Sequence, residues 1–580
     1  MYLLLSTLFY LLAVAVSSES PRLNVVPYPS ESLLGSGSSV LNSVFTIDIA
    51  ECSADCDVLR RAADRYLRII SRPVGSTGMV FRQTIFEDRI NASTPTGKSH
   101  SLRQMKVVTT GKEAVDLQLG VDESYALEVP GGSSADEVVT LTATTIWGAL
   151  RGLETFAQLV EYSAEQSERV VNWTPLQIMD SPRYPWRGLM IDSARHFLSV
   201  PLLEKTIDTL SAMKMNVLHW HIVDAESFPY SSEKYPDLRT KATYHPSAVY
   251  SPDAIKHLVT YARDRGVRVV PEFDTPGHTA SIGQAYPELI ADCYDWLKST
   301  NEGTLRWPMF NNVALDVTKS ETKLFVKSIM KEMSALFSDE YFHIGGDEVD
   351  QDCWNAVPSI LEWMQQNDFA SYNDSTQDWI YDFTALQGSW AGFAQDVTAA
   401  SSKKAVVWEE SFTLGFDLSP DTVVQVWLPD DGTDVLQRII ESGHQVILSN
   451  GWYLDRQAPT CTTDVGDCPV HWMWIWTGRD MYHVEPLTPS SSGWTPSEEQ
   501  AKLILGGEAA SWGESVDDKN FDSRVWSRVP GVAERLWSPS SLDDDWEIQP
   551  RLSVLACQLA RRGVQLADTQ PAFCDYYDSL

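Results

Sequence analysis

Two acidic residues, Asp347 and Glu348, stand side by side in the segment YFHIGGDEVD, directly after two glycines. Hydrolysis of a glycosidic bond needs a proton donor at the leaving oxygen and a group that stabilises an oxocarbenium-like transition state, and carboxyl groups can do both. Mutual repulsion and burial are expected to keep one of two adjacent carboxyls protonated. A solvated acidic turn is the alternative explanation, and for two isolated acids it is the simpler one.

Three of the 21 tryptophans, Trp408, Trp427 and Trp512, each follow a short aliphatic run. Sugars present C–H faces that stack on aromatic rings, so this placement predicts a carbohydrate pocket. Other tryptophans, such as Trp526 and Trp537, are expected to fill the core.

The histidines of the segment HWH, His219 and His221, lie on one face of a predicted strand, with Asp224 after them. Metal ligation is one interpretation, but no further His or Cys follows at a matching spacing, so we expect hydrogen-bonded histidines, no metal and no other cofactor. Asp274 and His278 share a turn, where the aspartate would orient the imidazole and so tune the acid. The sequence has no Gly-x-Ser-x-Gly elbow, phosphate loop or His-Glu-x-x-His motif.

From residue 181 onward, aliphatic runs alternate with amphipathic helices. One helix is expected after Ser251, with Pro252 in its first turn, and another after Thr318, which has Glu321 at capping-box spacing. About eight runs predict a parallel (β/α)8 barrel, the TIM-barrel fold, whose active site lies at the C-terminal strand ends. The runs end in polar or aromatic residues at Asp192 to Arg195, Asp224, Asp274 to His278, Asp347-Glu348, Trp408 to Glu410, Trp427, Tyr453 to Asp455 and Trp512 to Glu514. This convergence favours a pocket over a solvated turn for the acidic pair.

The region before the barrel, residues 19–180, is expected to be a smaller α+β domain. A helix is predicted over 55–71 and another over 147–162, and strands over 105–110, 116–121, 125–129 and 137–145. The segment GSGSSV at 35–40 is interpreted as a loop. Residues 181–580 then form the catalytic barrel with a C-terminal extension.

Composition excludes one class of partner. The chain of 580 residues carries a net charge of −34, so its surface repels nucleic-acid phosphates. Residues 1–18 have an apolar run too short to span a bilayer and followed by small residues, which indicates a signal peptide. No later segment is a membrane-span candidate, so we expect a secretory-pathway protein, extracellular or lysosomal/vacuolar.

Eight cysteines and three sequons fit this compartment. The candidate disulfide pairs are Cys52 with Cys56, Cys293 with Cys353, Cys461 with Cys468 and Cys557 with Cys574. The sequence leaves the connectivity open, and metal ligation by the thiols remains an alternative. The glycosylation candidates are Asn91, Asn172 and Asn373.

Several motifs together resemble one family. The sequence resembles the family 20 glycoside hydrolases, the β-N-acetylhexosaminidases, in the order and spacing of six segments. These are PRYPWRGLMIDSARHF, NVLHWHIVDAESFPY, EFDTPGHT, HIGGDEVD, WYLDR and GGEAASWGE…VAERLW. The resemblance implies an exo-acting, retaining mechanism in which the 2-acetamido group of the substrate is the nucleophile. Glu348 would then be the acid/base, Asp347 would hold the acetamido group, and Tyr453 would bond its oxygen.

The resemblance also implies a set of residues around the sugar. Trp408, Trp427 and Trp512 would wall the pocket, Arg187, Asp455 and Glu514 would hold hydroxyls, and Asp224, His278 and Asp274 would support the acid/base. Glycans or chitooligosaccharides are the implied substrates. A homodimer is an expectation by resemblance alone.

The sequence departs from some animal members after Trp427, where it runs LPDDGTD, and at the pair Asp455-Arg456. These changes leave the choice of aglycone open and do not support ganglioside hydrolysis. Two other functions stay as alternatives: a carbohydrate-binding protein on the same fold, and a barrel glycosidase with an ordinary carboxylate nucleophile.

Overall fold

The structure is a computed structural model. It describes residues 23–573 except 53, 73–79, 82–98, 112–114, 132–136, 164–167, 301–312, 429–433, 456, 459–473, 476, 488–492, 543–544 and 568–571. The expected signal peptide, Asn91, Cys461, Cys468 and Cys574 lie outside this range.

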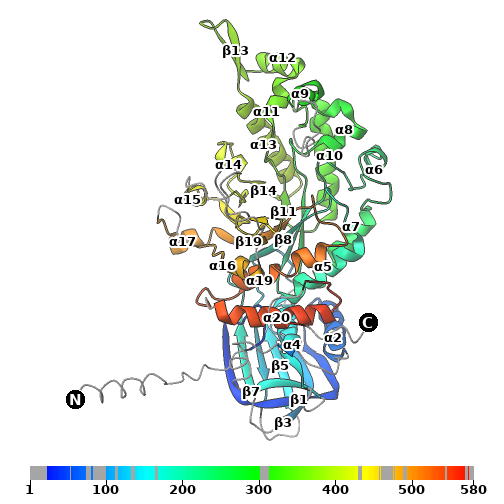
Figure 1. Cartoon of the computed structure of the whole chain (residues 1–580), viewed down its shortest axis with the longest axis vertical. Coiled ribbons are helices and arrows are strands. Elements are labelled where there is room, and N and C mark those ends of the chain that lie inside the picture. The colour runs from blue at the N-terminus through cyan, green and yellow to red at the C-terminus, as the bar shows by residue number, and fades with distance from the viewer. Residues whose placement is uncertain are drawn as a thin grey trace, which may run out of the picture.

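The N-terminal part is a six-stranded sheet in the order β1-β3-β5-β4-β7-β6, in which β1 also pairs with β7. Its strands are β1 (Glu31–Glu51), β3 (Ser99–Thr109), β4 (Tyr125–Val129), β5 (Glu137–Ala143), β6 (Val160–Ser163) and β7 (Glu168–Asp180). Helices α2 (Cys56–Ser71) and α4 (Ile146–Leu159) pack on it. All of α4 is buried, because it lies between the sheet and the barrel (Figure 1). The α+β prediction is confirmed.

Some local predictions for this region are wrong. The segment GSGSSV lies inside the long strand β1, because both neighbours of β1 pair with it there. Residues 116–121 form no strand, and the helix expected over 147–162 ends at Leu159, where β6 begins.

The second part is a closed parallel barrel in the order β8-β9-β10-β11-β14-β15-β16-β19, which confirms the predicted fold. Its strands are β8 (Trp186–Asp192), β9 (Val217–His221), β10 (Arg268–Glu272), β11 (Tyr341–His343), β14 (Lys404–Trp408), β15 (Val423–Val426), β16 (Gln445–Leu448) and β19 (Ile504–Ser511). The interior at the N-terminal ends is apolar, with Val217, Val270, Val406 and Ile447 among its residues.

Helices α5 (Val200–Ala212), α7 (Pro252–Arg263), α10 (Ser320–Leu336), α13 (Phe383–Ala400), α15 (Val435–Glu441) and α19 (Val529–Trp537) surround the barrel. The hydroxyl of Ser251 caps α7 by accepting a bond from Ala254 N, as predicted. Thr318 does not cap α10, which starts at Ser320, because its hydroxyl donates to Asp316 Oδ1 instead.

A buried polar cluster joins the sheet to the barrel. Asp180, at the end of β7, lies 2.8 Å from Lys214 Nζ and accepts bonds from Tyr125 OH and Trp537 Nε1. Lys214 follows α5 and Trp537 ends α19, so one carboxylate ties three parts of the chain together. Its burial with full pairing makes the junction specific rather than a loose hydrophobic contact.

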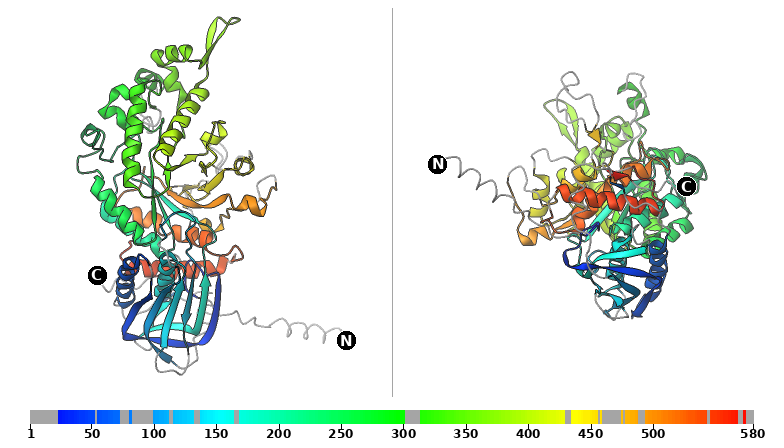
Figure 2. Two further views of the ribbon diagram at one scale, coloured as in Figure 1. Left: turned by 180° about the vertical axis from the view of Figure 1, so that it is seen from behind. Right: turned by 60° about the horizontal axis from the view of Figure 1, so that its bottom comes forward.

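Two additions flank the barrel. Helix α20 (Asp545–Arg561) crosses between barrel and sheet, and the hairpin of β12 (Ala370–Asn373) and β13 (Asp378–Tyr381) projects from the opposite end (Figures 1 and 2). The remaining elements are short: β2 (Val80–Phe81), α6 (Asp237–Lys241), α8 (Ala280–Ala285), η1 (Pro287–Leu289), α9 (Tyr294–Thr300), α11 (Gln351–Asn355), α12 (Pro358–Gln366), α14 (Glu410–Thr413), β17 (Gln457–Ala458), β18 (Trp474–Ile475), α16 (Gly478–His483), α17 (Glu498–Ala501), α18 (Phe521–Val525) and β20 (Ala572–Phe573). No helix among the described residues is long and apolar enough to cross a bilayer.

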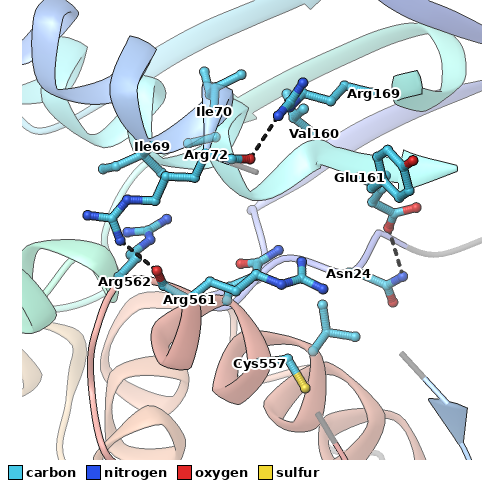
Figure 3. A pocket seen from close by; sticks show the side chains of 14 residues that line it. Asn24, Ile69, Ile70, Arg72, Val160, Glu161, Arg169, Cys557, Arg561 and Arg562 are labelled. Atoms are coloured by element: carbon cyan, nitrogen blue, oxygen red, sulfur yellow. Dashed lines mark hydrogen bonds between the residues drawn. The ribbon is translucent and has the colours of Figure 1, made fainter. Parts of the chain in front are cut away.

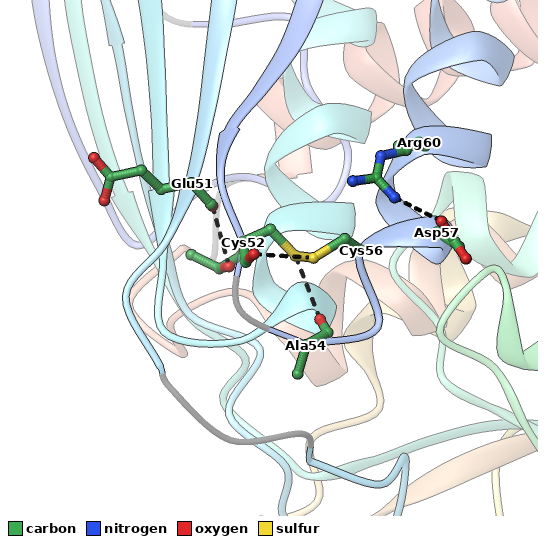
Figure 4. Close-up of a disulfide and its surroundings, with 7 residues drawn as sticks. Glu51, Cys52, Ala54, Cys56, Asp57 and Arg60 are labelled. Atoms are coloured by element: carbon green, nitrogen blue, oxygen red, sulfur yellow. Dashed lines mark hydrogen bonds and ion pairs between the residues drawn. A yellow bond between two sulfur atoms is a disulfide. The ribbon is translucent and has the colours of Figure 1, made fainter.

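Both expected disulfides whose two cysteines lie among the described residues are formed. Cys52–Cys56 links the end of β1 to the start of α2 (Figure 4), and Cys293–Cys353 joins segments 60 residues apart. Cys557 is also disulfide-bonded.

The two sequons that the structure describes differ in setting. The Asn172 amide donates to Glu161 Oε2 across the β6–β7 pair, whereas Asn373 lies at the turn of the exposed β12–β13 hairpin. Modification of either remains a prediction.

Candidate active site

Residues from the C-terminal strand ends meet at one end of the barrel. His278 Nε2 lies 3.5 Å from Glu348 Oε2 and 3.8 Å from Asp347 Oδ2, although these residues follow different strands, β10 and β11. Arg195, which follows β8, lies 3.0 Å from Asp224, which follows β9. The convergence predicted from the sequence therefore holds for the polar residues.

A line of hydrogen-bonding groups leads to Glu348. Asp224 Oδ1 lies 3.1 Å from His278 Nδ1, and the other ring nitrogen of His278 faces Glu348. Glu348 has a positive φ of 48°, and its side chain is 49% exposed. The buried residues Asp224 and His278 thus lie behind the carboxyl of Glu348, which is half-exposed to solvent.

The proton distribution in this line differs from the simple expectation for an acid. Contact with His278 lowers the pKa of Glu348, and Asp224 raises the pKa of His278 well above its usual value despite burial of the ring. Both shifts favour a protonated imidazole paired with an ionised Glu348, whose Oε2 lies 3.5 Å from His278 Nε2.

The protonated carboxyl of the adjacent pair is Asp347. Burial and the neighbouring Asp274 raise the pKa of Asp347 well above its usual value. Burial also raises the pKa of Asp274 to about 6, and its Oδ1 accepts a 2.7 Å bond from Gly346 N. These two carboxyls share a proton because both cannot ionise at close range.

Asp274 does not orient His278 as predicted. Its nearest approach to the ring is 3.9 Å, at Nε2, whereas Asp224 lies 3.1 Å from Nδ1. The positioning carboxylate of His278 is therefore Asp224, and Asp274 acts on Asp347.

Gly345, the first of the two glycines before Asp347 and Glu348, is required at its position for a steric reason. A Cβ at Gly345, where φ is +63°, would lie 1.8 Å from Asp274 Oδ1. Only glycine combines this left-handed backbone with this close approach. Gly345 therefore admits the carboxyl that holds Asp347.

Asp347 also has one oxygen in an unusual state. Its Oδ1 is buried and has no hydrogen-bond partner in the described part of the chain. A buried polar atom without a partner is costly, and such atoms occur where a ligand completes the bonding. This oxygen is an acceptor available to an N–H group in the pocket.

Aromatic rings line the space beside Asp347. Trp408 lies 6.4 Å from Trp427 and 6.1 Å from Trp512 between ring centroids, and Tyr453 stacks on Trp427 at 6.0 Å. The carboxylates of Asp347 and Asp455 contribute to a raised pKa of Tyr453, whose main cause is burial, so its hydroxyl is a neutral donor. All four aromatic residues predicted for the site come together.

The buried Glu272 and the half-buried Glu410 hold two of these rings. Trp408 Nε1 donates to Glu272 and Trp427 Nε1 donates to Glu410, at 2.8 and 2.9 Å. Burial, with Asp347 nearby, raises the pKa of Glu410 to about 8. Neither acid was predicted as a site residue, although Glu410 belongs to a strand end and could have been found on that ground.

The arginine prediction is wrong. Arg187 is the second residue of β8, at the opposite end of the barrel, where it is fully buried and contacts Glu123 at 2.7 Å. The arginine in the site is Arg195, whose guanidinium contacts Asp192, Asp224 and Glu226 and lies 5.1 Å from the Trp512 ring centre. Arg195 follows its strand, so the strand-end rule itself should have selected it.

The remaining predicted residues lie at the rim. Asp455 is exposed, and Glu514 Oε1 lies 4.0 Å from Arg195 Nη1 with a side chain 43% exposed. Burial of its carboxyl raises the pKa of Glu514. Both are placed to accept hydroxyl protons from a ligand.

Two buried groups have the separations of cation ligands: His219, Glu272 and His343, and Asp274, His278 and Asp347. In the first, His219 also bonds Glu508 at 2.7 Å, and Glu272 lies 2.5 Å from His221 Nδ1. Each group keeps a buried atom without a hydrogen-bond partner among the described residues, His219 Nε2 in the first and Asp347 Oδ1 in the second, and we assign no metal to either.

Comparison with known proteins agrees with this site. The family model described as "Glycosyl hydrolase family 20, catalytic domain" matches residues 184–540, and "beta-acetyl hexosaminidase like" matches residues 25–159. The chain is 37% identical to β-hexosaminidase subunit A1 of Dictyostelium discoideum, over 99% of this chain and 95% of the relative. It is 38% identical to the human β-hexosaminidase subunit beta, over 82% and 77%.

Solved structures give the same picture. A chitobiase from Flavobacterium johnsoniae superposes with a TM-score of 0.72 at 29% identity, covering 93% of this chain and 73% of that one. A β-N-acetylhexosaminidase from Streptomyces coelicolor has a TM-score of 0.68 at 24% identity, covering 95% and 99%, and is a likeness of fold.

Proposed function

Because the chain belongs to glycosyl hydrolase family 20 and is an exo-acting glycosidase with β-hexosaminidase activity, we propose that it releases terminal β-linked N-acetylglucosamine and N-acetylgalactosamine from glycans or chitooligosaccharides with the substrate's own acetamido group as nucleophile. One observation carries this proposal. The buried Oδ1 of Asp347 has no hydrogen-bond partner among the residues that the structure describes, and an acetamido N–H would supply one.

The first step forms a bond from the acetamido carbonyl oxygen to the anomeric carbon and breaks the bond to the leaving oxygen. Asp347 accepts the acetamido N–H, and the neutral Tyr453 hydroxyl donates to the acetamido oxygen. The ion pair of Asp347 with the positive oxazolinium nitrogen stabilises the intermediate. The positive nitrogen lowers the pKa of Asp347, so its proton passes to the neighbouring Asp274.

Glu348 donates the proton to the leaving oxygen. The unliganded line stores this proton on His278, 3.5 Å away. A bound sugar covers the half-exposed Glu348 and removes water, which raises its pKa and draws the proton across.

The second step reverses the roles. Glu348, now a carboxylate, takes a proton from water as the water attacks the anomeric carbon and the bond to the acetamido oxygen breaks. Two displacements at one carbon give a product with the substrate's configuration.

The decisive experiment compares aryl β-N-acetylglucosaminides with good and poor leaving groups. Glu348→Gln should lower kcat on the poor leaving group by about 10²–10⁴-fold, with a smaller loss on the good one. Asp347→Asn should impair both, because it acts on the acetamido group. Near-normal turnover in either variant would remove that residue's role.

An aryl β-glucoside tests the alternative mechanism. Comparable turnover of this substrate, which has no acetamido group, would indicate a carboxylate nucleophile. Binding of N-acetylglucosamine without turnover would indicate a binding protein.

We also propose a secretory route, to the outside or to a lysosome or vacuole, which the disulfides Cys52–Cys56 and Cys293–Cys353 support. Secretion of the full chain with cleavage after residue 18 would test the route. Light scattering of the purified protein would test the homodimer.

A further inference from the structure

A cavity lies where α20 meets the N-terminal α+β part, away from the C-terminal strand ends of the barrel (Figure 3). It has a volume of about 340 Å³ and is lined by the end of α2, by β6 and by the last turns of α20. None of the candidate active-site residues is in its lining.

Four guanidinium groups surround this cavity: those of Arg72, Arg169, Arg561 and Arg562. Figure 3 shows the Arg561 side chain extending from α20 along the cavity. The whole chain carries a net charge of −34, so this gathering of positive charge departs from the rest of the molecule.

Two of the arginines bind backbone carbonyls rather than carboxylates. Arg72 Nη1 donates to Arg561 O at 2.6 Å, and Arg169 Nη2 donates to Arg72 O at 2.7 Å. The Nε of Arg169 is buried with no acceptor among the described residues. The carbonyl oxygens hold the guanidinium groups of Arg72 and Arg169 in place without neutralising their positive charge. This charge and the Nε–H donor of Arg169 are therefore available to a ligand.

Nearby acids offset only part of the charge. Arg562 pairs with Glu154 at 2.8 Å, and Glu161 forms part of the wall. The Glu161 carboxyl accepts bonds from Asn24 and Asn172, and burial raises its pKa. Among the described residues that line the cavity, the four arginines therefore outnumber the one carboxylate, Glu161.

We propose that this cavity binds a phosphate or sulfate monoester of a monosaccharide-sized group. The planar fork of arginine matches tetrahedral oxyanions, and the wall formed by Ile69, Ile70, Ala157 and Val160 gives the organic part an apolar surface. The volume is in the range of small-molecule sites and exceeds what a bare oxyanion fills. The site is independent of the hydrolytic reaction.

The test is calorimetric titration of the full-length protein at fixed ionic strength with glucose 6-phosphate, glucose 6-sulfate and inorganic sulfate. At least one monoester should bind saturably and about 10-fold or more tighter than inorganic sulfate. Equal binding of all three would mean a simple anion site, and no saturable heat would mean no site; either result overturns the proposal.

Arg169→Gln should weaken monoester binding by about 10–100-fold, the loss expected for a charge-assisted hydrogen bond. Arg169→Lys keeps the charge but removes the fork, and a similar loss in this variant would separate recognition from folding. Arg60→Gln is the control, because Arg60 is exposed on α2, pairs with Asp57 and does not line the cavity. Hydrolysis of a β-N-acetylglucosaminide should stay within about twofold in all three variants, and equal binding in Arg169→Gln and Arg60→Gln would overturn the assignment.

Discussion

The carboxylate of Glu272 lies 2.5 Å from Nδ1 of His221 and is fully buried inside the barrel. His221 Nε2 in turn lies 2.6 Å from Asp224, the residue that positions His278. The other oxygen of Glu272 accepts the bond from Trp408 Nε1. One carboxylate thus supports both the proton line of Glu348 and a wall of the pocket.

Glu272→Gln should lower kcat by up to about 10²-fold, because small displacements of catalytic groups have effects of this size. It should also shift the pH dependence of kcat, because His221 loses one of its two negative partners and keeps only Asp224. Glu508→Gln is a matched control: Glu508 is equally buried and contacts His219, Gln425 and Trp186, but not Asp224. Equal pH profiles and equal losses in the two variants, with equal Tm, would contradict the role of Glu272.

Substitutions at Arg195 and Arg187 should separate an effect on catalysis from an effect on the stability of the fold. Arg195→Lys loses the fork that contacts Asp192, Asp224 and Glu226, so kcat/KM should fall about 10–100-fold. Arg187→Lys should leave kcat/KM within about twofold and lower Tm by about 3–10 °C, because it disturbs a buried pair at the domain junction. Steady-state kinetics and thermal melts of both variants check this, and an activity loss specific to Arg187→Lys would restore it to the site.

The sequence predicts the direction of the strands better than it predicts which side chains meet between them. Aliphatic runs with polar ends indicated the barrel and the location of Glu348, Asp347 and the aromatic wall, because strand direction alone decides which end faces the site. The same rule favours Arg195, which follows β8, over Arg187 near the start of that strand. Strand direction does not indicate that Asp224 rather than Asp274 meets His278, since this depends on side-chain paths across neighbouring strands.

Proton positions were also beyond the sequence. Adjacent acids predict that one holds a proton, but His278 beside Glu348 and Asp274 beside Asp347 decide which one. The length of β1 was missed for a different reason: its Gly and Ser residues are typical of loops, and pairing on both edges by β3 and β7 overrides that tendency.

Protonation of Glu410 should stabilise the folded protein more at low pH than at high pH. Its pKa in the folded protein is about 8, above its ordinary value of 4.5, so folding takes up a proton between these values. This contribution is favourable at low pH and is lost as pH rises through that window. The Tm should therefore fall between pH 5 and 8, and Glu410→Gln should flatten the fall; the exposed Glu441→Gln, on α15, should not. Parallel curves for wild type and Glu410→Gln would contradict the burial of a protonated carboxyl.

Gly345→Ala tests whether the close approach of Asp274 is required. The new Cβ would meet Asp274 Oδ1 at 1.8 Å, so the carboxyl must move, Asp347 loses its partner, and kcat should fall by about 10²-fold or more. Gly415→Ala is the control for backbone strain, because Gly415 has a similar φ of +78° but open space around it. Both variants should lose about 1–2 kcal/mol of stability from the left-handed backbone, and only Gly345→Ala should lose activity beyond that. Chemical denaturation and kcat on an aryl β-N-acetylglucosaminide, measured on the folded fraction, separate the two effects. Full activity in Gly345→Ala would show that Asp347 does not depend on Asp274.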